Sequence, residues 1–262
     1  MVMGEHSAVA LHHEIDGLAE APPVVLIGSL GSALDMWRPQ LPALTPDYRV
    51  IRVDHRGHGG SPVPAGPYTV AELAGDVLAL LDRLELERVH FVGLSLGGMV
   101  GMYLGSEAPE RIDRLVLCAT SAGYPDKAPW EARIEAVAGG GTDSVAPAVV
   151  RNWFTAEFAA TQPDTVAWAE ESVRKTPDLG YLGCCQAIRD WDHGRRLGAI
   201  TAPTLMVCGT ADPATPEQPH GATIAAGIPG ARFERVQAAH LLNIERPGEV
   251  NTLIAEHLGG SP

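Results

Sequence analysis

The 262-residue sequence predicts an α/β fold with a mostly parallel central sheet, and two observations lead to this prediction. Short runs rich in Val, Leu, Ile and Phe, bounded by turn residues, alternate with segments of helical periodicity along most of the chain. Such runs are typical of strands buried on both faces, and the alternation favours parallel strands joined by right-handed crossovers. The predicted strands are residues 22–28, 48–54, 88–93, 114–119, 204–209 and 232–237.

The clearest predicted helix covers residues 69–86. Its apolar residues recur at three- and four-residue steps, which is the stripe of an amphipathic helix packed on a sheet. Thr69 followed by Glu72 forms the pattern of a capping box at its start. A helix of this kind between two predicted strands supports the α/β assignment.

The strand–helix alternation stops after about residue 120 and resumes near residue 203. Four segments between these points have helical patterns separated by Gly or Pro: 130–141, 145–158, 164–175 and 176–192. We therefore predict an α/β core (1–123), an all-helical cap (124–200) and a second part of the core (201–262). An insertion that follows the carboxyl end of a strand should lie over the ligand crevice of such a sheet.

Composition limits the class of partner. With a formal net charge of −13, the protein lacks the excess of positive charge that attracts nucleic acid or an anionic membrane. An anionic small-molecule ligand would need a local cation in its pocket. The N-terminus lacks the pattern of a signal peptide, and no apolar stretch approaches the roughly 20 residues of a membrane span. The four cysteines form no disulfide framework, so we expect a cytoplasmic protein without a membrane partner.

The strongest motif is Gly93-Leu94-Ser95-Leu96-Gly97, which matches G-x-S-x-G. It follows a predicted strand and precedes a helical pattern, the context in which this motif is a nucleophile elbow. A chance match is conceivable in a chain with 29 glycines, but the strand and helix on either side argue against it. Ser95 is therefore the candidate nucleophile.

A serine hydroxyl needs a base, and the base needs an acid that orients it. In this architecture the chain order should be Ser, then Asp or Glu, then His. Asp212 follows one predicted strand and His240 follows the next, so both should reach the sheet edge where Ser95 lies. Alone, Asp212 could be a turn former and His240 a helix cap; together, and in this order, they predict a catalytic triad.

The tetrahedral intermediate of acyl transfer needs hydrogen-bond donors for its oxyanion. One should be the backbone N–H of Leu96, the residue after the nucleophile. The second should come from the loop after the strand at 22–28, where we choose Leu30, with Ser29 as the close alternative.

Two other groups of residues invite a chemical interpretation. His55 and His58 lie on a Gly-rich turn, but no carboxylate or cysteine completes a metal cluster with them. Cys184 and Cys185 are adjacent, and Thr176 with Pro177 fits an N-cap followed by Pro at the first helical position. On such a helix both cysteines join an apolar face, so we expect them to pack against the core or the pocket roof.

Several stretches together resemble the α/β-hydrolase superfamily over nearly the whole chain: 54–61, 93–97, 209–216 and 238–247. Other stretches resemble the 3-oxoadipate enol-lactonases of the β-ketoadipate pathway of aromatic catabolism: 29–37, 66–82, 130–141 and 180–192. The implied fold is a mostly parallel sheet flanked by helices, with an all-helical cap inserted after the sixth strand. One departure is Ile27-Gly28, where many superfamily members have His-Gly.

The resemblance implies a serine hydrolase that opens an enol-lactone through an acyl-enzyme, without metal or other cofactor. Because such a substrate carries a carboxylate, an arginine of the cap should bind it: Arg133 is our choice, with Arg151 and Arg189 as alternatives. Trp153 should form an apolar wall. Oligomeric state is not predicted, and a homo-oligomer stays open.

The motif also leaves other functions open. A carboxylesterase or lactonase of different acyl specificity would carry the same triad, and perhydrolysis could be a side activity. A non-catalytic ligand-binding protein on this fold is disfavoured by the intact Ser-Asp-His set. Haloalkane dehalogenase chemistry is disfavoured because it requires an Asp where Ser95 stands.

Overall fold

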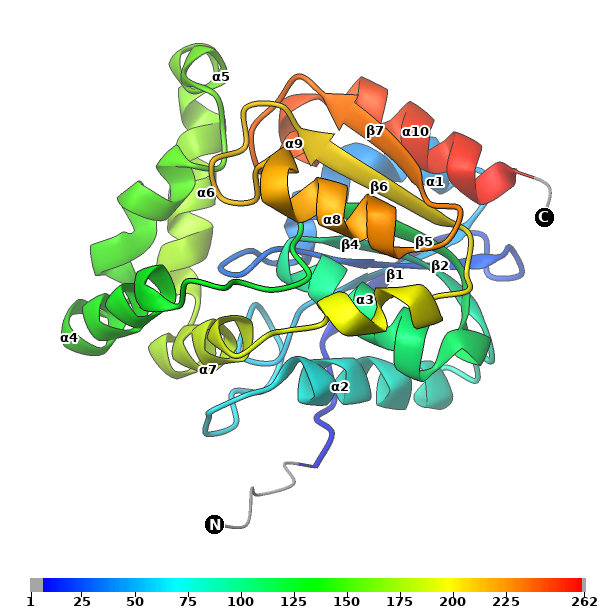
Figure 1. Ribbon diagram of the computed structural model, residues 1–262, viewed down its shortest axis with the longest axis horizontal. Helices are drawn as coiled ribbons and strands as arrows, with labels where there is room; N and C mark the ends of the chain where they lie inside the picture. The colour runs from blue at the N-terminus through cyan, green and yellow to red at the C-terminus, as the bar shows by residue number, and fades with distance from the viewer. Residues whose placement is uncertain (1–6, 261–262) are drawn as a thin grey trace.

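A seven-stranded sheet forms the centre of the computed structural model, which describes residues 7–260 (Figure 1). In space the strands follow the order β1-β3-β2-β4-β5-β6-β7, and all neighbours are parallel except β1 and β3. Their bounds are β1 His13–Gly17, β2 Pro23–Ile27, β3 Arg49–Val53, β4 Val89–Leu94, β5 Ile112–Cys118, β6 Thr204–Gly209 and β7 Arg232–Val236. The six predicted strands correspond to β2–β7, which confirms the mostly parallel sheet.

The edge strand β1 was not predicted. Its five residues, HEIDG, are mostly polar and exposed, so they lack the apolar run that marks the other strands. It pairs antiparallel with β3 along its whole length, and ion pairs add to this: the Arg52 guanidinium of β3 lies 2.5 Å from Glu14 Oε2 and 2.9 Å from Asp16 Oδ2. Hydrophobic periodicity cannot detect a strand that pairs in this way.

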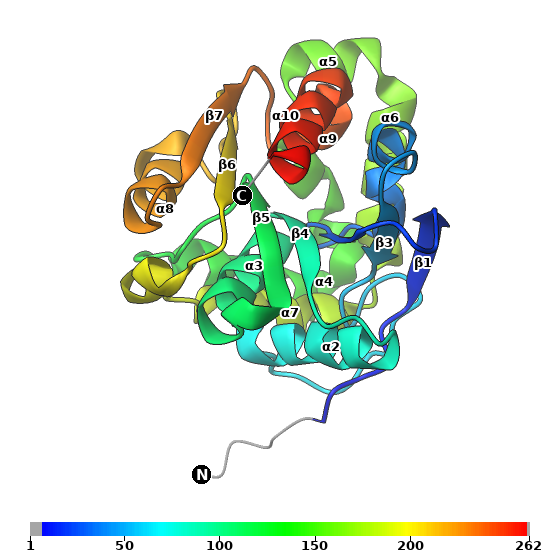
Figure 2. The ribbon, with the colours of Figure 1, turned by 90° about the vertical axis from the view of Figure 1, so that its right-hand side faces the viewer.

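Helices cover both faces of the sheet, with α2 (Val70–Arg83) and α3 (Leu96–Glu107) on one face and α10 (Pro247–Gly259) on the other (Figure 2). The shorter helices are α1 Leu41–Leu44, α8 Ala222–Gly227 and α9 Leu242–Glu245. The predicted capping box of α2 is confirmed, because Thr69 and Glu72 each accept a hydrogen bond from the other's backbone N–H.

Four helices follow β5 and lie together at one end of the sheet, on the left in Figure 1. They are α4 Ala128–Arg151, α5 Ala156–Thr161, α6 Pro163–Lys175 and α7 Asp178–Arg189. We call residues 124–200 the cap and the remainder the core. The predicted insertion point after a sixth strand is wrong: among the described residues only β1 precedes β2, so the cap follows the fifth strand.

The helix boundaries within the cap also differ from those predicted. The segments 130–141 and 145–158 were expected to be separate helices. Instead α4 runs through both and kinks at Gly141, whose φ of 69° is readily adopted only by glycine. The second segment then ends early, at Arg151, and α5 begins after the N-cap Thr155, whose side chain accepts a hydrogen bond from Phe158 N.

The parallel register brings four loops to one edge of the sheet. Ile27 at the end of β2 pairs with Gly93 near the end of β4, and Gly209 of β6 pairs with Val236 of β7. The loops that follow β2, β4, β6 and β7 therefore meet at the carboxyl edge, below the cap. None of the helices described for residues 7–260 is both long and apolar enough to cross a membrane.

Candidate active site

Ser95 sits on a sharp turn between β4 and α3 with φ 57° and ψ −114°, a strained conformation for a residue with a side chain. Its N–H donates to Cys118 O at 2.9 Å, and its carbonyl accepts from Thr120 Oγ1 at 2.7 Å. A Cβ on Gly97 would lie 2.1 Å from Ile27 O, so only glycine allows the elbow to pack this closely. The geometry is that of a nucleophile elbow.

Asp212 and His240 are paired and buried. His240 Nδ1 lies 2.8 Å from Asp212 Oδ2. The carboxylate also accepts hydrogen bonds from Thr215 Oγ1 at 2.6 Å and from the N–H of Ala214 at 2.8 Å. Burial acts to raise the pKa of Asp212, but the charge of His240 and the hydrogen bonds from His240 and Thr215 outweigh it and lower that pKa. An ionised Asp212 holds Nδ1 as the protonated nitrogen and leaves Nε2 available as a base.

A buried glutamate fixes the loop that carries His240. Glu245 accepts hydrogen bonds from Ala239 N at 3.0 Å and, from the cap, from Thr155 Oγ1 at 2.5 Å. Leu241 N donates to Trp153 O in the cap at 2.9 Å. Sequence reasoning missed Glu245, because its partners lie up to 90 residues away along the chain.

The two expected oxyanion donors lie on loops that are bonded to each other. Gly97 N, beside Leu96 in the first turn of α3, donates to Gly28 O at 3.0 Å. Within the described part of the chain, the backbone N–H groups of Leu30 and Leu96 have no hydrogen-bond acceptor. Both are thus free to bind an oxyanion. The N–H of Ser29, the alternative donor, likewise has no acceptor among the described residues, and Ser29 lines the same cavity as Leu30.

A cavity of about 540 Å³ lies between the core and the cap. From the predicted site, Leu30, Ser95, Arg133, Trp153 and His240 all line it. Sequence reasoning did not identify three further aromatic residues of its wall: Tyr124, Trp130 and His220. The Tyr124 ring centroid lies 5.5 Å from that of Trp130 and 5.2 Å from that of His220. Aromatic rings therefore form part of the cavity wall.

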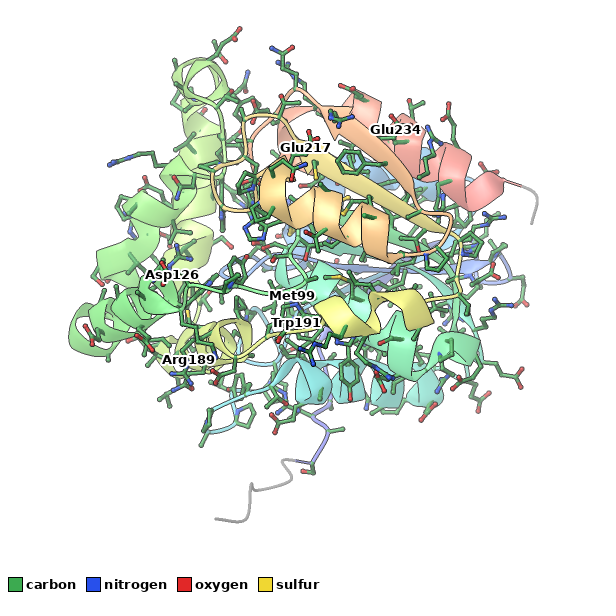
Figure 3. All side chains as sticks on the ribbon, viewed as in Figure 1. Met99, Asp126, Arg189, Trp191, Glu217 and Glu234 are labelled. Carbon is green, nitrogen blue, oxygen red and sulfur yellow. The ribbon has the colours of Figure 1, made fainter. Side chains whose placement is uncertain are left out.

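Of the three arginine candidates, Arg133 alone lines the cavity. Its guanidinium carbon lies 4.8 Å from the centroid of the Trp130 ring, and among residues 7–260 it has no carboxylate within salt-bridge distance. Arg189 pairs with Asp190 at 2.6 Å and lies at the end of α7, whereas the cavity residue Asp126 lies on the loop before α4 (Figure 3). Arg151 is exposed at the end of α4.

The adjacent cysteines are packing residues of α7. Both are fully buried, and Cys184 Sγ lies 3.9 Å from Arg56 O in the core. Burial raises the pKa of Cys185 to about 12, which disfavours a thiolate. The expected Thr176 cap is wrong by one residue: Pro177 is the N-cap of α7, and the Thr176 hydroxyl donates to Ser172 O at the end of α6.

His55 and His58 bind backbone groups. His55 Nε2 lies 3.0 Å from Gly28 O, and His58 Nε2 accepts from Gly31 N at 2.9 Å. No group of three or more His, Cys, Asp or Glu side chains within residues 7–260 is arranged to hold a metal ion.

This fold and this site define an α/β hydrolase, and the chain belongs to that family: the family described as alpha/beta hydrolase fold matches residues 22–247. It is similar to 3-oxoadipate enol-lactonase 2 of Acinetobacter baylyi, with 33% identity over 93% of this chain and 91% of that protein. It is also similar to a candidate carbamate hydrolase, RutD, of Stutzerimonas stutzeri, with 31% identity over 95% of this chain and 96% of the relative. Among solved structures, the enol-lactonase from Burkholderia xenovorans LB400 superposes with a TM-score of 0.91 and 38% identity, covering 96% and 97% of the two chains.

Proposed function

We propose that this protein is a serine hydrolase that opens an enol-lactone carrying a carboxylate, with 3-oxoadipate enol-lactone as the expected substrate. The observation that carries the proposal is the composition of one cavity. Its wall combines Ser95, the His240 imidazole bound to Asp212, the Leu30 loop and the guanidinium of Arg133. The likeness to enol-lactonases supports the choice of substrate.

The proposed mechanism begins with proton transfer from Ser95 Oγ to His240 Nε2 as Oγ attacks the lactone carbonyl. The N–H groups of Leu30 and Leu96 stabilise the resulting oxyanion. The ring C–O bond then breaks, His240 protonates the leaving oxygen, and the released enol becomes a ketone. Water, activated by His240, hydrolyses the acyl-enzyme and frees Ser95. The enol is already a good leaving group, so this route requires no metal or other cofactor.

Arg133 is the proposed anchor for the substrate carboxylate. A protein with a net charge of −13 repels anions at long range, so it needs a cation within the pocket. A guanidinium binds a carboxylate in a bidentate fashion, and Arg133 has no competing acidic partner among the described residues. Trp153, buried to 3% exposure, supplies an apolar part of the wall of the same cavity.

Two other substrate classes remain as alternatives on the same triad. An ester or lactone with a different acyl group would need the same nucleophile, base and oxyanion hole. A carbamate is the second alternative, favoured by the similarity to the RutD relative.

The test follows the loss of enol-lactone absorbance, alongside p-nitrophenyl butyrate and a simple carbamate under the same conditions. We expect the enol-lactone to have the highest kcat/KM, and Ser95→Ala to abolish turnover of all three. Ser106→Ala is the matched control, because Ser106 lies on α3 with the same 8% exposure but outside the cavity. If the wild type turns over the ester or the carbamate but not the lactone, the proposed substrate is wrong and the serine-hydrolase mechanism still stands.

A further inference from the structure

The peptide that carries the Leu30 N–H is oriented through its carbonyl. That carbonyl belongs to Ser29, and it accepts hydrogen bonds from Ser32 N at 3.1 Å and from Ser32 Oγ at 2.7 Å. In a trans peptide the N–H and C=O groups point in opposite directions. The Leu30 N–H must therefore point away from Ser32.

Gly31, the next residue, is held from two sides. Its φ of 80° lies in the left-handed region, which glycine adopts without strain. Its N–H donates to His58 Nε2 of the core at 2.9 Å, and its carbonyl accepts from Ser172 Oγ of cap helix α6 at 3.1 Å. Both partners are remote in sequence, so the conformation of this loop depends on tertiary contacts.

The protonation state of His58 suits this role. Its Nδ1 lies 3.2 Å from Arg56 O and can only donate there, so Nε2 is the unprotonated nitrogen that accepts from Gly31. Burial and the neighbouring His55 lower the pKa of His58 to about 4, against the opposing charge of Asp54, so the neutral imidazole prevails at neutral pH. At its start the loop is tied to the nucleophile elbow, because Gly28 O is a partner of both His55 Nε2 and Gly97 N.

We propose that His58 and Ser172 are positioning residues that clamp Gly31 between core and cap and so aim the Leu30 N–H at the oxyanion. This inference rests on the proposed use of Leu30 as an oxyanion donor, but not on the identity of the substrate. Neither side chain lines the cavity, so each acts through the loop. The cap, through Ser172, thereby contributes to the catalytic step as well as to the shape of the pocket.

The experiment measures kcat and KM of His58→Ala, His58→Gln and Ser172→Ala with the neutral ester p-nitrophenyl butyrate. A misplaced catalytic group or a lost oxyanion donor typically lowers the rate by about 10²-fold or more. We expect kcat to fall by about 10–10²-fold in His58→Ala and by roughly threefold to tenfold in Ser172→Ala, with KM nearly unchanged. His58→Gln should recover much of the loss, because its amide oxygen can accept from Gly31 N.

An oxyanion-specific readout separates positioning from general destabilisation. The inhibition constant of an alkyl trifluoromethyl ketone, which forms an oxyanion adduct with a catalytic serine, should rise in proportion to the loss of kcat/KM. The matched controls are Ser144→Ala, which removes a cap serine that donates to Gly141 O, and His257→Gln, which alters a buried histidine on α10. Both should keep wild-type kinetics.

Folded Ser172→Ala and His58→Ala variants with wild-type kcat and inhibition constant would overturn the inference, as would losses confined to KM. Ester hydrolysis that survives Ser95→Ala would overturn both this inference and the proposed mechanism. If the wild type hydrolyses the ester but not the enol-lactone, only the proposed substrate fails, and the same variants still decide the role of His58 and Ser172.

Discussion

The core side and the cap side of the cavity differ in the interactions that hold their side chains in place. On the core side, the Asp212 carboxylate alone accepts four hydrogen bonds, from His240, Ala214 and the N–H and hydroxyl of Thr215. On the cap side, the wall is mainly apolar, with aromatic, proline and valine side chains, and its polar members are Asp126, Asn152 and Arg133. The Arg133 guanidinium has no carboxylate within salt-bridge distance among the described residues. The reacting groups are thus fixed by directional hydrogen bonds, whereas the cap side presents mostly apolar side chains and a few polar ones. Substitutions of the reacting groups on the core side should lower kcat for every substrate. Substitutions of the cap side chains that line the cavity should change which substrate is preferred.

The largest effect is expected from Asp212→Asn on the core wall. An asparagine can donate to His240 Nδ1 and so favours the tautomer with a protonated Nε2, which cannot act as a base. The equivalent change in a serine-protease triad lowers kcat by about 10⁴-fold, and we expect a loss of about 10³–10⁴-fold here for lactone and ester alike.

Steady-state kinetics on both substrates measure the effect of Asp212→Asn. The control is Asp178→Asn in the cap, where the only group among residues 7–260 that donates to the carboxylate is the N–H of Thr142. A loss of tenfold or less in Asp212→Asn would contradict the triad. A loss confined to one substrate would contradict the view that the core groups act on every substrate alike.

A smaller and selective effect is expected from Arg133→Met on the cap wall. A hydrogen bond to a charged group contributes about 1.5–3 kcal/mol, which corresponds to roughly 10–10²-fold in affinity. KM for the anionic lactone should rise by this factor, and KM for the neutral ester should hardly change. Arg189→Met, which removes an arginine already paired with Asp190, is the control. Equal changes for both substrates would show that Arg133 does not bind the carboxylate.

The core was more predictable from sequence than the cap, for a physical reason. Strands such as β4 are buried along their whole length, so their continuous apolar runs predict them. The G-x-S-x-G motif after β4 then predicts the position of Ser95 at the end of that strand. Chain order and strand ends predicted Asp212 and His240 as the pair that the structure brings to 2.8 Å. In the cap, a kink at Gly141 joins two segments whose patterns suggested separate helices.

Residues that act through tertiary contacts carried no usable sequence signal. Glu245, Ser172 and His58 bind groups between 6 and 141 residues away, and no local spacing encodes those pairs. In the sequence, His58 stands out only as a histidine on a Gly-rich turn, without the carboxylate or cysteine that a metal site would need. Its partner, Gly31 N, lies in a loop whose own residues give no indication of what supports it. The nucleophile could be predicted from the sequence because it lies in a local motif. The residues that position the catalytic loops could not, because their contacts form only when distant segments of the chain meet.

The smallest predicted effect concerns stability and uses two buried histidines of the core, His55 and His58, which do not line the cavity. Burial lowers the pKa of both His55 and His58 to about 4, whereas an unfolded chain has histidine pKa values near 6.5. Between these values the unfolded state binds more protons than the folded state, so the free energy of unfolding rises with pH. This contribution is fully present above about pH 6.5 and is lost as the pH falls toward 4, at about 1.4 kcal/mol per pH unit for each histidine.

Replacing His58 by Gln removes one of the two histidines that bind a proton on unfolding. The slope of unfolding free energy against pH should therefore decrease by up to about 1.4 kcal/mol per pH unit between pH 5 and 6.5. Urea denaturation at several pH values in this window gives the slope, which is independent of any constant stability change that the substitution causes. His55→Gln should give a similar decrease, because His55 is equally buried and also binds a backbone group of the Leu30 loop. Parallel curves for His58→Gln and wild type would mean that His58 is not a neutral hydrogen-bond acceptor in the folded protein. The proposed contact of His58 with Gly31 N would then not position the loop.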